Sequence, residues 1–311
     1  MEYDGTMSVE RRVDTVMVDQ RAGAFSRRSI KTDSKAAGLR LAISMLDLTT
    51  LEGKDSPDKV RSLCRKAMRP YAGELDLPVP TVAAVCVYPS HVQTAARMLA
   101  GSGVKVASVA TGFPSGQYPL DVRLKDVSAA IDAGADEIDM VINRGAFLSG
   151  RETEVAEEIR QVWQACDGAH LKIILETGEL ETYQNIRKAS DLAIEAVAST
   201  GVLRDGEVFI KTSTGKISPA ATMPVTLVML EAIRDHFIST GIRIGMKPAG
   251  GIKTAKQALH YLVMVKETLG EEWLTPGLFR FGASSLANDL LRQLLKGLTG
   301  HYMAMHDFSE A

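Results

Sequence analysis

The regular recurrence of short apolar runs is the feature that most constrains the fold of this chain. Each run is rich in Val, Ile, Leu or Phe, and most end in or run into Gly, Pro, Ser, Thr or Asn, which is typical of buried parallel strands. The eight runs are LAISMLDL (41–48), VAAVCVYP (82–89), VKVASVATGFP (104–114), EIDMVIN (137–143), LKIILETG (171–178), VFIKTSTG (208–215), IGMKPAGG (244–251) and LFRFGASS (278–285). We therefore expect eight buried strands.

Stretches with apolar residues at helical spacing alternate with these runs. They cover residues 58–68, 90–100, 122–133, 154–165, 183–198, 224–238, 254–268 and 285–296. This alternation predicts an α/β fold of the (β/α)8 type, a TIM barrel. The alternative is an open, doubly wound sheet. Against it, no GxGxxG motif follows the first run, and polar residues end nearly every run instead of marking one switch point.

The first 37 residues differ in composition from the rest and show little apolar periodicity. We expect them to form a partly ordered extension, followed by a catalytic barrel over residues 38–300 and a tail over residues 301–311. Acidic residues in the extension argue against a mitochondrial presequence, and we therefore expect a cytoplasmic protein.

The overall composition excludes several classes of function. The net charge of −2 offers no electrostatic reason to expect a nucleic acid as partner. No apolar run reaches the roughly 18 residues that a membrane span needs. The three cysteines are far apart and form no CxxC pair, so they are expected to be free thiols in a reducing compartment.

Charged residues near the ends of the predicted strands indicate where chemistry takes place, because active sites of such barrels lie at the carboxyl ends of the strands. Lys211 and Lys247 follow the apolar residues of the sixth and seventh runs and precede their turn residues, and Asp139 lies in the fourth run. Desolvation and a neighbouring ammonium both lower the pKa of a lysine. The resulting neutral amine attacks carbonyl carbon. Taken singly, however, a strand-end lysine is more usually a solvated residue whose stem covers apolar surface, so this alternative stays open.

Small residues follow three adjacent predicted strands and indicate a phosphate site. They are Gly215-Lys216, Gly250-Gly251 and Ser284-Ser285. Glycines let backbone N–H groups approach an anion, and the loops after the last two strands of barrels commonly bind phosphate. Each glycine alone could serve only a turn.

These motifs resemble the deoxyribose-phosphate aldolase family. The segments that carry the resemblance are DLTTL (47–51), VCVYP (85–89), GADEIDMVIN (134–143), KIILETGEL (172–180), FIKTSTGK (209–216), KPAGGIKTA (247–255) and RFGASSL (280–286). The resemblance implies a class I aldolase without metal or other cofactor, which reversibly cleaves 2-deoxy-D-ribose 5-phosphate to D-glyceraldehyde 3-phosphate and acetaldehyde in deoxyribonucleoside catabolism. Its partners would be these small molecules, with neither nucleic acid nor membrane, and a homodimer is a possible assembly.

The resemblance also implies a role for individual residues. Lys211 would form the Schiff base, Lys247 would lower its pKa, and Asp139 would relay protons. The implied substrate-binding residues are Thr49, Cys86, Thr212, Thr214, Gly215, Lys216, Gly250, Gly251, Ser284 and Ser285. The chain ends in HYMAMHDFSEA, without the terminal tyrosine of some members, so the tail receives no role.

Two other functions remain possible at this stage. One is a different lysine Schiff-base barrel, such as a transaldolase or another sugar-phosphate aldolase. The other is a barrel that binds a phosphorylated ligand without turnover, although a protein that only binds has no use for an imine-forming amine.

Overall fold

The computed structural model describes residues 11–73, 78–201, 203–304 and 307–309. Within these residues, one sheet of seven parallel strands forms the centre, and each strand pairs with the next along the chain. The strands are β1 (Asp47–Thr49), β2 (Ala84–Val87), β3 (Lys105–Val109), β4 (Glu137–Val141), β5 (His170–Ile174), β6 (Val208–Lys211) and β7 (Gly245–Lys247). Each overlaps one of the first seven apolar runs.

The eighth apolar run closes the sheet into a barrel, although it forms single bridges instead of a regular strand. Phe279 and Gly282 make parallel bridges beside β7, and Phe281 makes one beside β1. The backbone N–H of Asp47 donates to the carbonyl oxygen of Phe281 at 2.9 Å. Glycine is required in this segment because a Cβ at Gly282 would lie 2.6 Å from that of Ala249. The predicted TIM-barrel-like architecture is therefore confirmed, with an irregular eighth member.

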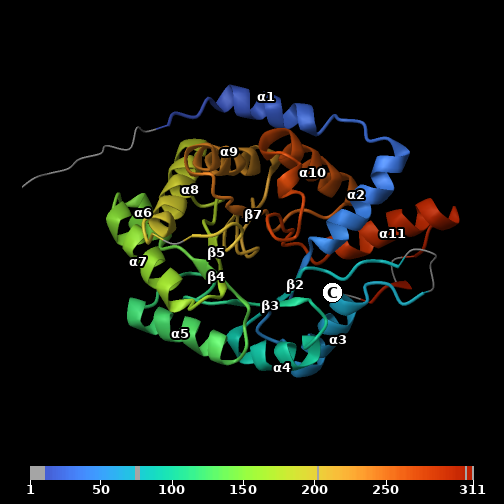
Figure 1. Cartoon of the computed structure of the whole chain (residues 1–311), viewed down its shortest axis with the longest axis horizontal. Coiled ribbons are helices and arrows are strands. Elements are labelled where there is room, and N and C mark those ends of the chain that lie inside the picture. The colour runs from blue at the N-terminus through green and yellow to red at the C-terminus, as the bar shows by residue number, and fades with distance from the viewer. Residues whose placement is uncertain (1–10, 74–77, 202, 305–306, 310–311) are drawn as a thin grey trace, which may run out of the picture.

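Helices surround the strands on the outside (Figure 1). They are α3 (Pro57–Met68), α4 (Pro89–Leu99), α5 (Leu120–Asp132), α6 (Arg144–Leu148), α7 (Glu152–Ala165), α8 (Tyr183–Ala198), α9 (Met223–Thr240), α10 (Ala255–Leu269), the 3-10 turn η1 (Glu271–Trp273) and α11 (Leu286–Thr299). All but α6 and η1 match the predicted helical stretches. Side-chain caps fix their starts: Ser56 accepts from the N–H of Lys59, and Thr254 forms a capping box with Gln257. Among the described residues, none of the helices is both long and apolar enough to cross a bilayer.

Two helices that the sequence patterns did not predict precede the barrel. α1 (Thr15–Phe25) packs against α9 and α10, and α2 (Thr32–Ser44) packs against α10 and α11 (Figure 1). The expectation of a strand from residue 41 is therefore wrong up to residue 44. Its apolar residues bury a helix face instead, because Leu39, Ala42 and Ile43 are all buried at helical spacing.

The predicted division of the chain into extension, barrel and tail remains a prediction. The boundary between residues 37 and 38 lies within α2, and residues 1–10 lie outside the described residues. In the tail, Phe308 is buried against the apolar core, and Lys66 of α3 donates a hydrogen bond to the carbonyl oxygen of Ser309.

The inner face of the barrel differs in chemistry from its outer face. Outward-facing residues such as Ile138 and Ile210 belong to the main apolar core with the helices. Because strand side chains alternate, the neighbours Asp139 and Lys211 face the interior. The register sets Lys211 beside Lys247. The barrel therefore has a charged interior, where burial is costly unless the charges pair.

Candidate active site

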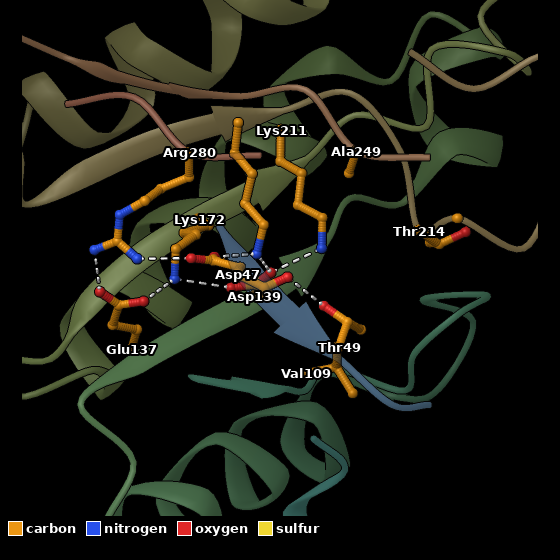
Figure 2. A network of polar contacts seen from close by, with 12 residues as sticks. Asp47, Thr49, Val109, Glu137, Asp139, Lys172, Lys211, Thr214, Ala249 and Arg280 are labelled. Carbon is orange, nitrogen blue, oxygen red and sulfur yellow. Dashed lines mark hydrogen bonds and ion pairs between the residues drawn. The ribbon is translucent and has the colours of Figure 1, made fainter. Parts of the chain in front are cut away.

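Seven charged side chains form one network inside the barrel (Figure 2). All are buried, with exposed fractions of 5% or less. They are Asp47 of β1, Glu137 and Asp139 of β4, Lys172 of β5, Lys211 of β6, Lys247 of β7, and Arg280 of the eighth, bridging segment. We call this set the charge network.

Asp139 is the centre of the charge network. Its Oδ2 lies 2.7 Å from Nζ of Lys211 and 2.9 Å from Nζ of Lys247, and its Oδ1 lies 3.1 Å from Nζ of Lys172. The structure thus brings together the three residues that the sequence predicts as catalytic, because Lys211 and Lys247 both contact the carboxylate of Asp139. It adds a third lysine, which the sequence interpretation did not include in the site.

The three lysines differ in their electrostatic surroundings. Burial and the charge of Lys247 lower the pKa of Lys211, against the opposing effect of Asp139. Burial also acts to lower the pKa of Lys247, but Asp139 and Asp47 overcome it and raise that pKa. Lys172 likewise has a raised pKa, because nearby carboxylates overcome its burial. Lys211 is therefore the lysine of this network that most readily loses its proton.

Asp139 keeps its negative charge in this setting. Burial acts to raise its pKa, but Lys172, Lys211 and Lys247 together hold the pKa well below its ordinary value. A carboxylate that stays ionised can orient the amine of Lys211 throughout a reaction cycle.

A cavity of about 390 Å³ opens above the charge network at the carboxyl ends of the strands. Lys211 lines it, and of the predicted substrate-binding residues Thr49, Thr214, Gly215, Lys216, Gly250, Gly251, Ser284 and Ser285 also line it. One concave site therefore holds the amine and the predicted phosphate loops. Among its other lining residues is Glu52, which forms an ion pair with Lys216 at 2.8 Å.

The loops after β6 and β7 hold their shape through glycine conformation and one buried carboxylate. Gly250 has φ +77°, a region that L side chains rarely adopt, and a Cβ there would lie 2.7 Å from that of Ala220. On the other loop, the backbone N–H of Thr214 donates to both oxygens of Glu176 at 3.2 and 3.3 Å, and its hydroxyl also bonds this carboxylate. Glu176 itself has φ +56°, a strained value for a non-glycine residue.

The hydroxyls of Ser284 and Thr212, both predicted to bind substrate, also make bonds within the protein. The hydroxyl of Ser284 donates to the carbonyl oxygen of Thr49 at 2.9 Å and accepts from the N–H of Thr49 at 2.6 Å, so it ties the eighth segment to β1. The buried hydroxyl of Thr212 accepts from the N–H of Ala249 at 2.8 Å and donates to its carbonyl oxygen at 3.1 Å. Thr212 does not line the cavity. Its role, like that of Ser284, remains a prediction.

Cys86 faces the interior from β2, within a small apolar cluster with Leu51, Ala107 and Val109. Burial and the charge of Asp139 raise the pKa of its thiol to about 11. The thiol therefore stays protonated at neutral pH, which argues against a nucleophile, and Cys86, like Thr212, is not among the residues that line the cavity.

Comparison with known proteins places this geometry in a family. The sequence profile described as "DeoC/LacD family aldolase" matches residues 41–292. The chain belongs to the DeoC/LacD family of aldolases. The resemblance drawn from its sequence motifs is thereby confirmed, and the match includes the whole charge network.

Individual relatives of this DeoC/LacD aldolase support the same assignment. A deoxyribose-phosphate aldolase of Mus musculus is 50% identical over 290 residues, which cover 91% of this chain and 88% of the mouse protein. The deoxyribose-phosphate aldolase of Homo sapiens is 49% identical over 291 residues, with coverage of 91% and 88%. Among solved structures, an aldolase named QR15 is 28% identical and superposes with a TM-score of 0.61, covering 82% of this chain and 97% of that one.

The sequence interpretation assigned no role in the site to four charged residues of the charge network, which are Asp47, Glu137, Lys172 and Arg280. A signal was present, because each interrupts an apolar run at a position whose side chain faces the barrel interior. Alternation alone, however, does not tell which face of a strand is inward before the barrel is closed.

Proposed function

We propose that this aldolase reversibly cleaves 2-deoxy-D-ribose 5-phosphate to D-glyceraldehyde 3-phosphate and acetaldehyde through an imine on Lys211. The names of relatives at 50% and 49% identity support this substrate. The observation that carries the mechanism is Lys211 itself: a buried amine with a lowered pKa that lines the cavity and lies 2.7 Å from a carboxylate.

The amine of Lys211 adds to the aldehyde carbon C1 of the open-chain sugar, and loss of water leaves a protonated imine. Removal of the proton from the 3-hydroxyl then allows the C2–C3 bond to break. Its electrons move into the imine to form an enamine, and C3 departs as the aldehyde carbon of glyceraldehyde 3-phosphate. Protonation of the enamine at C2 and hydrolysis release acetaldehyde and regenerate the amine.

Asp139 and Lys247 are proposed to move protons during these steps. Oδ2 of Asp139 contacts both lysine nitrogens, so protons can pass between them over a short path. The raised pKa of Lys247 keeps it an ammonium that can donate a proton and then recover it. The same positive charge opposes protonation of Lys211.

The phosphate is proposed to bind at the loops after β6 and β7 and at the start of α11. Backbone N–H groups of the glycine turns, the amino end of α11 and the ammonium of Lys216 all favour an anion. The proposed phosphate-binding residues are Gly215, Lys216, Gly250, Gly251, Ser284 and Ser285, which all line the cavity. Thr214 is proposed to contact the sugar chain, and Thr49, Cys86 and Thr212 to border it.

The wider setting of the reaction is also a proposal. We infer that the protein acts in the cytoplasm, in deoxyribonucleoside catabolism, on small molecules only and without a cofactor. A homodimer is a possible assembly that stays a prediction.

Borohydride reduction in the presence of acetaldehyde tests the mechanism. The reduced adduct should add mass to the peptide that contains Lys211, and Lys211→Arg should abolish it. An adduct on Lys172 or Lys247 would contradict the assignment.

Substrate assays separate the alternatives. Release of acetaldehyde from deoxyribose 5-phosphate distinguishes this function from that of a transaldolase or another sugar-phosphate aldolase. A protein that only binds the ligand would give neither adduct nor acetaldehyde.

A further inference from the structure

Arg280 connects two strands across the floor of the barrel without lining the cavity. Its NH1 lies 2.7 Å from Oδ1 of Asp47, and its NH2 lies 2.9 Å from Oε1 of Glu137. Its Nε donates to the carbonyl oxygen of Pro276, and its guanidinium lies 5.8 Å from the ring centroid of Phe209. The guanidinium is therefore held in one orientation, and Figure 2 shows its contacts with Asp47 and Glu137.

Each carboxylate that Arg280 binds turns its other oxygen to a lysine. Oδ2 of Asp47 lies 2.6 Å from Nζ of Lys247, and Oε2 of Glu137 pairs with Nζ of Lys172. A planar guanidinium suits this task because its fork binds two acceptors at fixed directions, whereas an ammonium is a compact point charge.

This arrangement divides the carboxylates unequally among the three lysines. Lys172 contacts both Glu137 and Asp139. Lys247 contacts both Asp47 and Asp139. Within the part of the chain that the structure describes, Lys211 pairs with Asp139 alone, through the oxygen that Lys247 also contacts.

We propose that Arg280 is a positioning residue for the reaction of Lys211. It orients Asp47 and Glu137 so that these carboxylates support Lys247 and Lys172 as ammonium ions, and it thereby leaves Lys211 with one shared carboxylate. The inference rests on the proposed role of Lys211 and extends it to a residue outside the cavity.

The balance of charge in the network points the same way. The network has three carboxylates, and Arg280, Lys172 and Lys247 supply three cations, so the network is neutral when Lys211 is a free amine. Removal of Arg280 would leave one excess negative charge, which protonation of Lys211 would neutralise. Removal of the charge of Glu137 would have the opposite effect.

The other charged and titratable groups around Lys211 come from several strands. They are Asp139 of β4, Lys172 of β5, Lys247 of β7, Asp47 of β1 and Cys86 of β2, with Glu137 and Arg280 one contact further away. Cys86 stays a neutral thiol at neutral pH, because its pKa is about 11. Glu52, Lys216 and Lys253 also line the cavity with Lys211, and Glu52 and Lys216 pair with each other.

The test compares Arg280→Gln, Glu137→Gln and the double variant with wild type. Two quantities are measured against pH: kcat/KM for deoxyribose 5-phosphate, and the rate at which borohydride traps acetaldehyde on Lys211. Arg123→Gln is the matched control, because Arg123 forms an equally buried ion pair with Glu158 between α5 and α7, away from the site.

Opposite shifts are expected from the two single variants. Arg280→Gln should move the acid limb of both profiles to higher pH by about one unit, a tenfold loss below the limb. Glu137→Gln should move it to lower pH, and the double variant should return it towards wild type. Arg123→Gln should lower the thermal midpoint without moving the limb.

A limb that stays in place, or that moves in the same direction in both single variants, would overturn the inference and leave Arg280 with a purely structural role. If Arg280→Gln does not fold, the test rests on Glu137→Gln. A shift of its acid limb to lower pH supports the inference, and a shift to higher pH or no shift overturns it. Peptide mapping keeps the two proposals apart. An adduct on another lysine defeats the proposed function, whereas an adduct on Lys211 with no shift of the limb defeats only the role of Arg280.

Discussion

The substitution Lys247→Leu tests whether a second ammonium keeps Lys211 reactive. Nζ of Lys247 and Nζ of Lys211 both contact Oδ2 of Asp139, at 2.9 and 2.7 Å. Leucine removes the charge and keeps much of the apolar stem. Without the competing ammonium, the protonated form of Lys211 no longer shares Oδ2 of Asp139, so the pKa of Lys211 should rise.

The size of the effect follows from the distance. Two nitrogens that share one oxygen at these lengths lie at most about 5 to 6 Å apart, and unit charges at that separation interact by about 3 kcal/mol at an effective dielectric constant of about 20. This energy corresponds to about two pKa units, and Asp47 and Asp139 reduce it because they partly neutralise Lys247. A rise of about one to two units is expected, with a fall in kcat/KM at neutral pH of about 10- to 100-fold.

The assay is the pH profile of kcat/KM for wild type and Lys247→Leu, with circular dichroism as a check of folding. Activity should recover in part as the pH rises, because alkali deprotonates Lys211 directly. It should not recover fully if Lys247 also moves protons. Lys105→Leu is the control, since Lys105 begins β3 at the opposite end of the barrel and is exposed. An unchanged profile with a near-normal rate would refute the reasoning.

Three further predictions concern the cavity and the buried thiol of Cys86. Ser285→Glu places a carboxylate at the proposed phosphate site. KM for deoxyribose 5-phosphate should rise strongly, while kcat/KM for unphosphorylated deoxyribose should change much less. Equal losses of activity on both substrates would contradict the proposed position of the phosphate. Glu52→Gln frees Lys216 from its ion pair, so KM for the phosphorylated substrate should fall by about two- to fivefold, as expected for an exposed pair, with no change for deoxyribose. Cys86 should resist alkylation at neutral pH and react faster only as the pH approaches its pKa of about 11. Mass spectrometry of the modified peptide can follow the reaction, and rapid labelling at neutral pH would contradict the prediction.

Much of the barrel could be predicted because its signals are local. Eight helical stretches matched observed helices, since their apolar spacing and caps such as Ser56 and Thr254 act within one or two turns. The run from residue 41 was misassigned at its start because a short apolar stretch fits a buried helix as well as a strand. Only the contact of α2 with α10 and α11 decides between them.

The candidate site could be predicted in part for a similar reason. Lys211 and Lys247 stand out because each ends an apolar run, and the glycine pairs stand out because turns need them. Glu137 and Arg280 lie 143 residues apart in the chain, and no local pattern relates them. Their pairing depends on which side chains face inward and on how the eighth segment meets β1.

The sequence by itself determined the alternation of strands and helices, the family, and the residue types available at each strand end. These follow from periodicity and motif, which are properties of neighbouring residues. Only the tertiary structure decided how three carboxylates are shared among four cations, and hence which lysine is left as the most acidic. The physical reason is that closing the barrel removes these charges from water, and the pKa of each then depends on partners brought in from other strands.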